Sequence, residues 1–140
     1  MITWNNLDTL ASFKELSNVK KVNLVEAMAG ENGAERVKNY SVPMAAGLAY
    51  NYAAKQVDDE VLEALKKLAT EAQLTEKYAA LYNGEVINTG EKRLVLHQLT
   101  RGQLGDTVTA DGVDKRAFYV EQQQKIADFA NKVHAGEITN

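Results

Sequence analysis

The stretch DDEVLEALKKLATEA, residues 58–72, is the clearest helix in the sequence. Its apolar residues recur every three or four positions and form one face, and Glu63 and Lys67 make a favourable pair on the polar side. Asp58 is expected to cap the helix, and Asp59 and Glu60 place negative charge at the positive end of the helix dipole. The apolar face consists of Val61, Leu62, Leu65, Leu68, Ala69 and Ala72. Because such a face has to be buried, the stretch predicts a structural helix that packs against other elements.

Shorter helices are predicted on both sides of this one. Downstream, the sequence TEKYAALYNG predicts a two-turn helix that Gly84 closes in the C′ position. Upstream, apolar spacing predicts three short helices, at residues 7–16, at residues 24–29 with Gly30 as the stop, and at residues 34–39.

The C-terminal third is also predicted to be helical. We expect a helix at residues 91–100 that stops at Gly102, then a loop at residues 103–112. The longest helix is predicted at about residues 113–135, with Asp111 as its cap and Gly136 as its end. A helix of about 34 Å has little to cover it in so short a chain. We therefore expect residues 1–140 to be a helical portion of a larger protein.

The segment around the single proline, Pro43, has a different character. Proline cannot sit inside a helix without losing a backbone donor and clashing with the preceding turn. Tyr40, Val42 and Met44 alternate with other residues before the small residues 45–47, and a second alternating run follows. This pattern predicts a β-hairpin at about residues 40–53. The predicted fold class is therefore mainly α with one short hairpin, which needs a partner because an isolated hairpin is marginally stable.

Composition limits the classes of protein. The chain has 45% hydrophobic and 25% charged residues, as a folded domain does, and a net charge of −3 with both signs interspersed. A nucleic-acid-binding protein usually carries a basic excess or stripe, so no nucleic-acid partner is expected. The absence of cysteine excludes disulfides and thiolate metal sites, and no apolar run is long enough to span a membrane. We expect a cytoplasmic protein without a membrane partner.

One arrangement of side chains stands out from this background. Arg93, His97 and Arg101 recur every fourth residue, which would direct them broadly one way on a helix, and Glu91 is a nearby carboxylate. Such a group could contact a substrate anion directly. The intervening residues are mostly apolar, which favours a buried helix whose charged groups hold neighbouring segments or form an interface. Both readings remain open from the chemistry alone.

The same stretch, YNGEVINTGEKRLVLHQLTRG, resembles a segment of the glucose-6-phosphate isomerase family. The family pattern, in general form, is F-x-G-E-x-I-N-x-T-E-x-R-A-V-L-H-x-A-L-R. The chain departs from it at Gly90, Leu94, Leu99 and Thr100, and has Tyr52-Ala53-Ala54-Lys55 in place of Tyr-Ser-Lys-Asn. The resemblance extends over most of residues 40–137. The matching positions are Gly84, Glu85, Ile87, Asn88, Glu91, Arg93, Val95, Leu96, His97 and Arg101.

The resemblance implies a parent enzyme that interconverts glucose 6-phosphate and fructose 6-phosphate by proton transfer through an enediol, without a metal or organic cofactor. It also implies a dimer whose intact subunits contain α/β/α sandwich domains. The family's phosphate-binding Gly-Ile-Gly-Gly-Ser stretch and its catalytic groups follow the long helix, so no residue here is expected to be catalytic. The expected partners are the remainder of the chain, a second subunit and, for the parent, the sugar phosphate. The resemblance favours a supporting or interface role for Glu91, Arg93, His97 and Arg101.

Two other interpretations stay open. The chain could be a free-standing helical protein-interaction domain with no catalytic activity. It could also be a small enzyme that uses Glu91, Arg93 and His97 directly. The isomerase interpretation predicts that the 140 residues alone are inactive.

Overall fold

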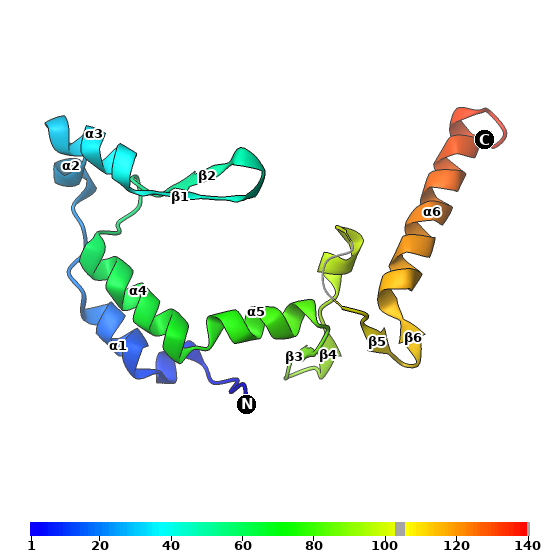
Figure 1. The fold of residues 1–140 in the computed structure, drawn as a ribbon, viewed down its shortest axis with the longest axis horizontal. Coiled ribbons are helices and arrows are strands. Elements are labelled where there is room, and N and C mark those ends of the chain that lie inside the picture. The colour runs from blue at the N-terminus through cyan, green and yellow to red at the C-terminus, as the bar shows by residue number, and fades with distance from the viewer. Residues whose placement is uncertain (103–105, 140) are drawn as a thin grey trace. The chain divides into compact units, whose positions relative to one another are not determined.

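The computed structural model describes residues 1–102 and 106–139 and divides them into two compact units (Figure 1). We call Asn5–Gln73 the hairpin unit. The second, the long-helix unit, consists of Met1–Trp4 and the described residues from Leu74 onward. Each unit is described by itself.

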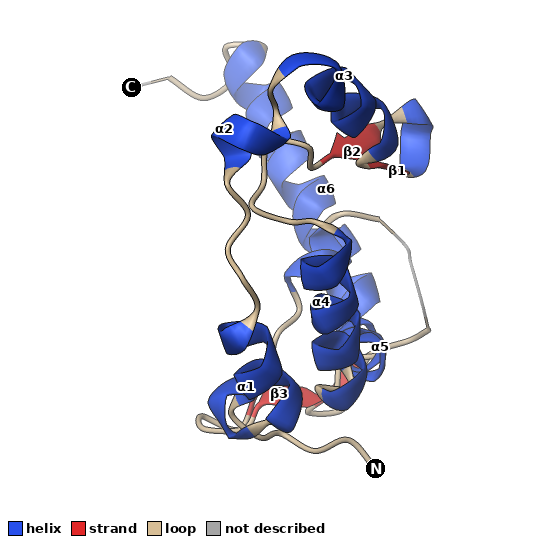
Figure 2. Cartoon of the chain, turned by 90° about the vertical axis from the view of Figure 1, so that its left-hand side faces the viewer, coloured by secondary structure: helices blue, strands red, loops and turns tan. Residues whose placement is uncertain are grey.

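The hairpin unit contains four α-helices and one strand pair among its described elements. In chain order these are η1 (Leu7–Thr9), α1 (Ala11–Asn18), α2 (Leu24–Ala27), α3 (Gly30–Asn39), β1 (Ser41–Pro43), η2 (Ala45–Gly47), β2 (Ala49–Asn51) and α4 (Asp59–Glu71). Helix α1 lies alongside α4 in both views (Figures 1 and 2). The carboxylate of Asp58 accepts a hydrogen bond from the Val61 N–H at 2.9 Å, which confirms the predicted cap of α4.

Gly30 does not end a helix, contrary to the prediction from the sequence. Helix α2 already ends at Ala27, and Gly30 is the first residue of α3, with φ of +56°. Two backbone bonds close the end of α2, from Met28 N–H to Leu24 O and from Ala29 N–H to Glu26 O. The chain therefore turns earlier than predicted, and α3 starts four residues earlier than the expected residue 34.

The predicted hairpin is confirmed. β1 and β2 are antiparallel, with Ser41 opposite Asn51, Val42 opposite Tyr50 and Pro43 opposite Ala49. The ring centroids of Tyr40 and Tyr52, at the base of the hairpin, lie 5.2 Å apart.

Arg36 connects α3 to the segment that follows the hairpin. It is 7% exposed, and its guanidinium donates to the carbonyl oxygens of Ala53 at 2.8 Å, Lys55 at 3.0 Å and Val57. The same guanidinium lies 4.2 Å from the centroid of the Tyr40 ring. Bonds to three carbonyls and an aromatic face stabilise a buried cation without a carboxylate.

The long-helix unit surrounds a small core of Ala80, Leu99 and Val108, each at most 2% exposed. Its elements are α5 (Leu74–Tyr82), β3 (Val86–Asn88), β4 (Arg93–Leu94), η3 (His97–Thr100), β5 (Thr109–Ala110), β6 (Val113–Asp114) and α6 (Lys115–His134). The strands pair as β3–β4 and β5–β6, two short antiparallel pairs that are not among the elements predicted from the sequence.

The predicted helix at residues 91–100 is wrong. Asn88 Oδ1 accepts from the Glu91 N–H at 3.2 Å, and Lys92 has a left-handed φ of +54°. This local turn sends residues 93–94 back along β3, so that only His97–Thr100 form a short 3₁₀ helix. Of the predicted loop at residues 103–112, positions 103–105 lie outside the described residues, and Thr109–Ala110 form β5.

The predicted cap of the long helix is also wrong, whereas the helix itself is confirmed. Asp111 and Gly112 have φ of +53° and +72° and form the turn between β5 and β6. Asp114 caps α6 instead, with its carboxylate accepting from the Arg116 N–H at 2.9 Å. Gly136 ends the helix as predicted, through its N–H bond to Val133 O at 3.1 Å. None of the described helices is long and apolar enough to cross a membrane.

Candidate functional site

The structure divides the four predicted site residues into two places within the long-helix unit. Glu91 and Arg93 lie at the β3–β4 turn, where Glu91 Oε2 is 3.8 Å from Arg93 Nη1 and accepts from Asn88 Nδ2 at 3.2 Å. The side chains of Glu91 and Arg93 are 63% and 76% exposed. An ion pair this exposed is screened by solvent and contributes little to stability.

His97 and Arg101 share a different place. Both line a hollow of about 310 Å³ together with Leu81, Tyr82, Val95 and Gln98. The structure therefore brings His97 and Arg101 together, whereas Arg93 is not part of the lining. The broadly one-sided arrangement of all three, expected from a continuous helix, is not present.

Two glutamines hold the short helix η3 that carries His97. Gln98 Nε2 donates to Leu81 O of α5 at 2.8 Å, and Gln123 Nε2 of α6 donates to Thr100 O at 2.8 Å. Gln98 Oε1 is buried and has no hydrogen-bond partner among the described residues. The hollow thus contains an imidazole, a guanidinium and a phenol but no carboxylate, so a carboxylate base for proton transfer is not among its lining residues.

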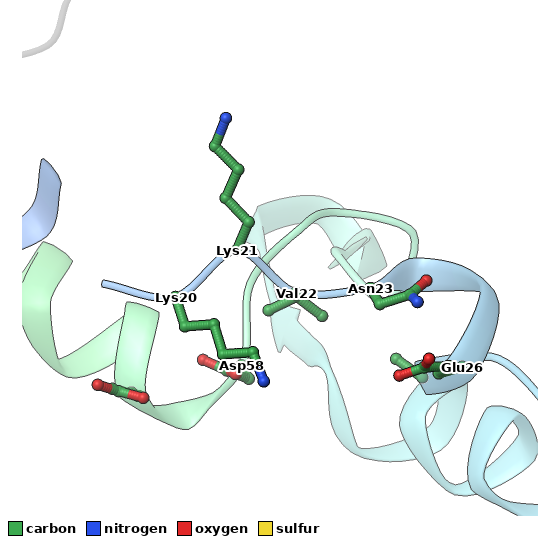
Figure 3. Close-up of a pocket in the computed structure, with 8 residues that line it drawn as sticks. Lys20, Lys21, Val22, Asn23, Glu26 and Asp58 are labelled. Carbon is green, nitrogen blue, oxygen red and sulfur yellow. The ribbon is translucent and has the colours of Figure 1, made fainter. Parts of the chain in front are cut away.

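The hollow of about 560 Å³ in the hairpin unit lies where the chain passes from α1 to α2 beside the start of α4. Figure 3 shows the Lys20 side chain extending toward Asp58, while Lys21 points away. Glu26 and Glu60 also line the hollow. Lysines and carboxylates are mixed around it, so it does not select a ligand of either charge.

Two polar residues of this hollow are already used to cap helices. Asp58 accepts from the Val61 N–H of α4, and Asn23 Oδ1 accepts from the Val25 N–H of α2 at 3.1 Å. Their positions are explained by the helix ends that they satisfy. The hollow is therefore a surface groove between capped helix ends.

A second carboxylate performs a capping role that the sequence did not reveal. Glu71 of α4 accepts hydrogen bonds from the Ala11 N–H at 3.3 Å, from the Ser12 N–H at 2.8 Å and from the Ser12 hydroxyl. The bonds from Ser12, with a smaller contribution from Ala11, lower the pKa of Glu71 from its usual range. Glu71 is 59 residues from Ser12, so no local sequence signal identifies the contact.

The described residues contain no group of three or more His, Cys, Asp or Glu side chains that could hold a metal ion. Arg36 is a further buried charge that no sequence pattern singled out, and its partners are backbone carbonyls of its own unit. Asp58, Asn23, Glu71 and Arg36 thus bind helix ends and loop carbonyls of their own unit.

Comparison with known proteins identifies the relatives of the chain. The family model described as phosphoglucose isomerase matches residues 51–140. A glucose-6-phosphate isomerase of Treponema denticola is 51% identical over 140 residues, which cover 96% of this chain and 27% of that protein. Glucose-6-phosphate isomerases of Treponema pallidum and Borrelia garinii subsp. bavariensis are 42% and 40% identical and are each covered over 26% of their length. The chain thus spans about a quarter of the curated relatives that it matches, and it belongs to the phosphoglucose isomerase family.

Proposed function

We propose that these 140 residues are the N-terminal portion of a glucose-6-phosphate isomerase, and that the complete polypeptide interconverts glucose 6-phosphate and fructose 6-phosphate by enediol proton transfer in the cytoplasm. The observation that supports this best is the coverage of the Treponema denticola isomerase, which is 51% identical over 96% of the chain but only 27% of its own length. The proposal includes a second subunit as a partner of the complete enzyme.

The catalytic groups are proposed to lie outside this chain. The hollow that contains His97 and Arg101 has no carboxylate in its lining, and the pair of Glu91 and Arg93 is exposed at a turn. The proposed role of these four residues is to support neighbouring segments or an interface. We also propose that α6 leads into the domain that binds the sugar phosphate, since its Schellman-type ending at Gly136 lets the chain turn into a further element.

The test compares the 140-residue chain with a chimera in which the chain is followed by the remaining sequence of the Treponema denticola relative. Formation of glucose 6-phosphate from fructose 6-phosphate is measured for both proteins, with the intact relative as the control. The chimera is expected to turn over substrate and the 140-residue chain is not. Turnover by the purified chain would show that it carries its own catalytic groups. A folded but inactive chimera would contradict the proposed activity of the complete polypeptide.

A further inference from the structure

The backbone of the β1–β2 hairpin pairs internally and also presents groups on its outer edges. Tyr52 N–H bonds to Tyr40 O at 2.9 Å and Met44 N–H bonds to Leu48 O at 2.8 Å. Because bonded and non-bonded pairs alternate in an antiparallel ladder, Val42 and Tyr50 form the bonded pair between them. The backbone groups of the other two pairs, Ser41 with Asn51 and Pro43 with Ala49, therefore point away from the hairpin.

Pro43 makes the two outer edges different. It has no N–H, and it lies at a position where that N–H would point outward, so the outer edge of β1 lacks a donor. Ala49 and Asn51 on the outer edge of β2 keep both their N–H and C=O groups. The hairpin is a two-stranded sheet within the described residues, and no described strand continues it beyond β2. Figure 1 shows both strands running out from the end of α3 to the η2 turn.

The even-numbered face of the same hairpin is apolar and incompletely covered. Val42, Tyr50 and Tyr52 form one wall of a groove of about 260 Å³, and Leu62 and Leu65 of α4 contribute to the lining. Lys55 and Val57 complete the lining. Val42 and Tyr50 are each 49% exposed, and Leu65 is 38% exposed. A two-stranded sheet with a half-exposed apolar face needs a further element for stability.

We propose that a β-strand from the part of the polypeptide outside residues 1–140 adds to the outer edge of β2 and inserts apolar side chains into this groove. The inference rests on the proposed function, in which the chain is about a quarter of a longer isomerase. Strand addition satisfies the outward N–H and C=O groups of Ala49 and Asn51, and alternate side chains of the added strand reach the groove. Lys55, the charged residue in the groove lining, selects a strand with a carboxylate at that end.

The remainder of the same polypeptide is the occupant that the observations favour. The relatives are about four times as long as the aligned segment, so a large amount of chain is available within the same molecule. A segment tethered to the hairpin has a high effective concentration, whereas a second copy has to be gathered from solution. Pro43 also restricts the pairing to one edge, so that only one strand can be added with full bonding.

Hydrogen exchange of the complete polypeptide tests the proposal. The amides of Ala49 and Asn51 are expected to exchange at least about 100-fold more slowly than the amide of Ser41, which points outward from the β1 edge. Tyr50, bonded within the hairpin, is the internal reference for a protected amide. Ala49 and Asn51 amides that exchange as fast as Ser41 would overturn the proposal. Protection that increases with protein concentration would also overturn it, because the occupant would then be a second copy.

The substitution Ala49→Pro provides a second measurement. It removes one outward N–H, and Leu48 already has the extended φ and ψ of −79° and 157° that a residue before proline requires. Exchange at Asn51 is expected to rise at least about tenfold while Tyr50 stays protected. An unchanged Asn51 rate in a variant that keeps its hairpin would contradict strand addition. If Tyr50 also loses protection, the substitution has unfolded the hairpin. The exchange rates of Ala49 and Asn51 in the unsubstituted protein then test the proposal.

Failure of the strand-addition inference and failure of the proposed function give different results. Isomerase turnover with unprotected Ala49 and Asn51 removes the strand-addition inference and leaves the proposed activity in place. Protected amides in a polypeptide without turnover remove the proposed activity and leave the strand addition in place.

Discussion

At the residue scale, Gly84 meets two requirements that no other residue type meets together. It has φ of +71° after α5, and the bonds from Gly84 N–H to Leu81 O and from Glu85 N–H to Ala80 O close the helix. A Cβ at this position would also lie 2.3 Å from Cγ1 of Val108, which is 2% exposed. The conformation was predictable from the sequence ending YNG, whereas the contact with a residue 24 positions away was not.

The substitution Gly84→Ala is expected to destabilise the long-helix unit by about 2–4 kcal/mol. A left-handed alanine costs about 1–2 kcal/mol, and forcing Val108 aside adds the penalty of an overpacked core. Denaturant unfolding monitored by circular dichroism measures the change. Gly136→Ala is the matched control, since Gly136 closes α6 at φ of +72° and a Cβ added there would have no other atom within 4 Å. Equal losses for the two variants would show that the Val108 contact does not matter.

At the element scale, helix α1 depends on a residue from another helix. Its N-cap residue Leu10 provides no side-chain hydrogen bond, and the carboxylate of Glu71 on α4 binds the first N–H groups instead. The negative charge also lies at the positive end of the α1 dipole. One carboxylate thus joins the start of α1 to the end of α4.

This contact predicts a dependence of stability on pH. The Ser12 bonds lower the pKa of folded Glu71 below its ordinary value of 4.5, so the ionised carboxylate stabilises the folded state. The contribution is fully present above pH 4.5 and is lost as the pH falls through the lower folded value. Glu71→Gln is therefore expected to lower the melting temperature by a few degrees at about pH 7 and to lower it progressively less as the pH falls below 4.5. Thermal melts over a pH series that extends below 4.5 measure this trend.

The control for the charge of Glu71 is Glu63→Gln, on the same helix. Glu63 pairs with Lys66 at 2.6 Å, but the two side chains are 66% and 61% exposed, so their ion pair is screened by solvent. The Glu63 variant is expected to melt close to the unsubstituted protein at every pH of the series. A Glu71 variant that behaves like the Glu63 variant would contradict the interhelical cap.

Elements were predictable where the local signals agreed with one another. The stretch at residues 58–72 combines a cap, an acidic first turn and one apolar face, and α4 forms there as Asp59–Glu71. The segment at residues 91–100 lacks that agreement, because Leu94, Val95 and Leu96 suit a strand as well as a helix. Asn88 and the pair Asp111-Gly112 are strong turn formers. The turns that they make reverse the chain and so allow β3 to pair with β4 and β5 to pair with β6. The Glu71 cap could not be predicted, since it joins residues 59 positions apart.

At the scale of the whole molecule, the resemblance identified the family, whereas the spacing of charged residues misled the search for a site. Arg93, His97 and Arg101 are four residues apart, but a strand and a 3₁₀ helix with its C-cap carry them instead of one α-helix. The hollow that His97 and Arg101 share has no carboxylate in its lining. We therefore keep the proposal that these positions support neighbouring segments and do not move a proton.

The complete polypeptide should therefore tolerate His97→Gln. A supporting role predicts that kcat/KM for fructose 6-phosphate falls by less than about threefold, whereas loss of a general acid or base lowers the rate by about 10²–10⁴-fold. Steady-state assays of the folded variant distinguish these outcomes. His134→Gln, at the end of α6, is the control because it replaces the other histidine of these 140 residues. A hundredfold loss confined to the His97 variant, with its melting temperature unchanged, would place His97 in the reaction itself and would make the hollow part of the active site.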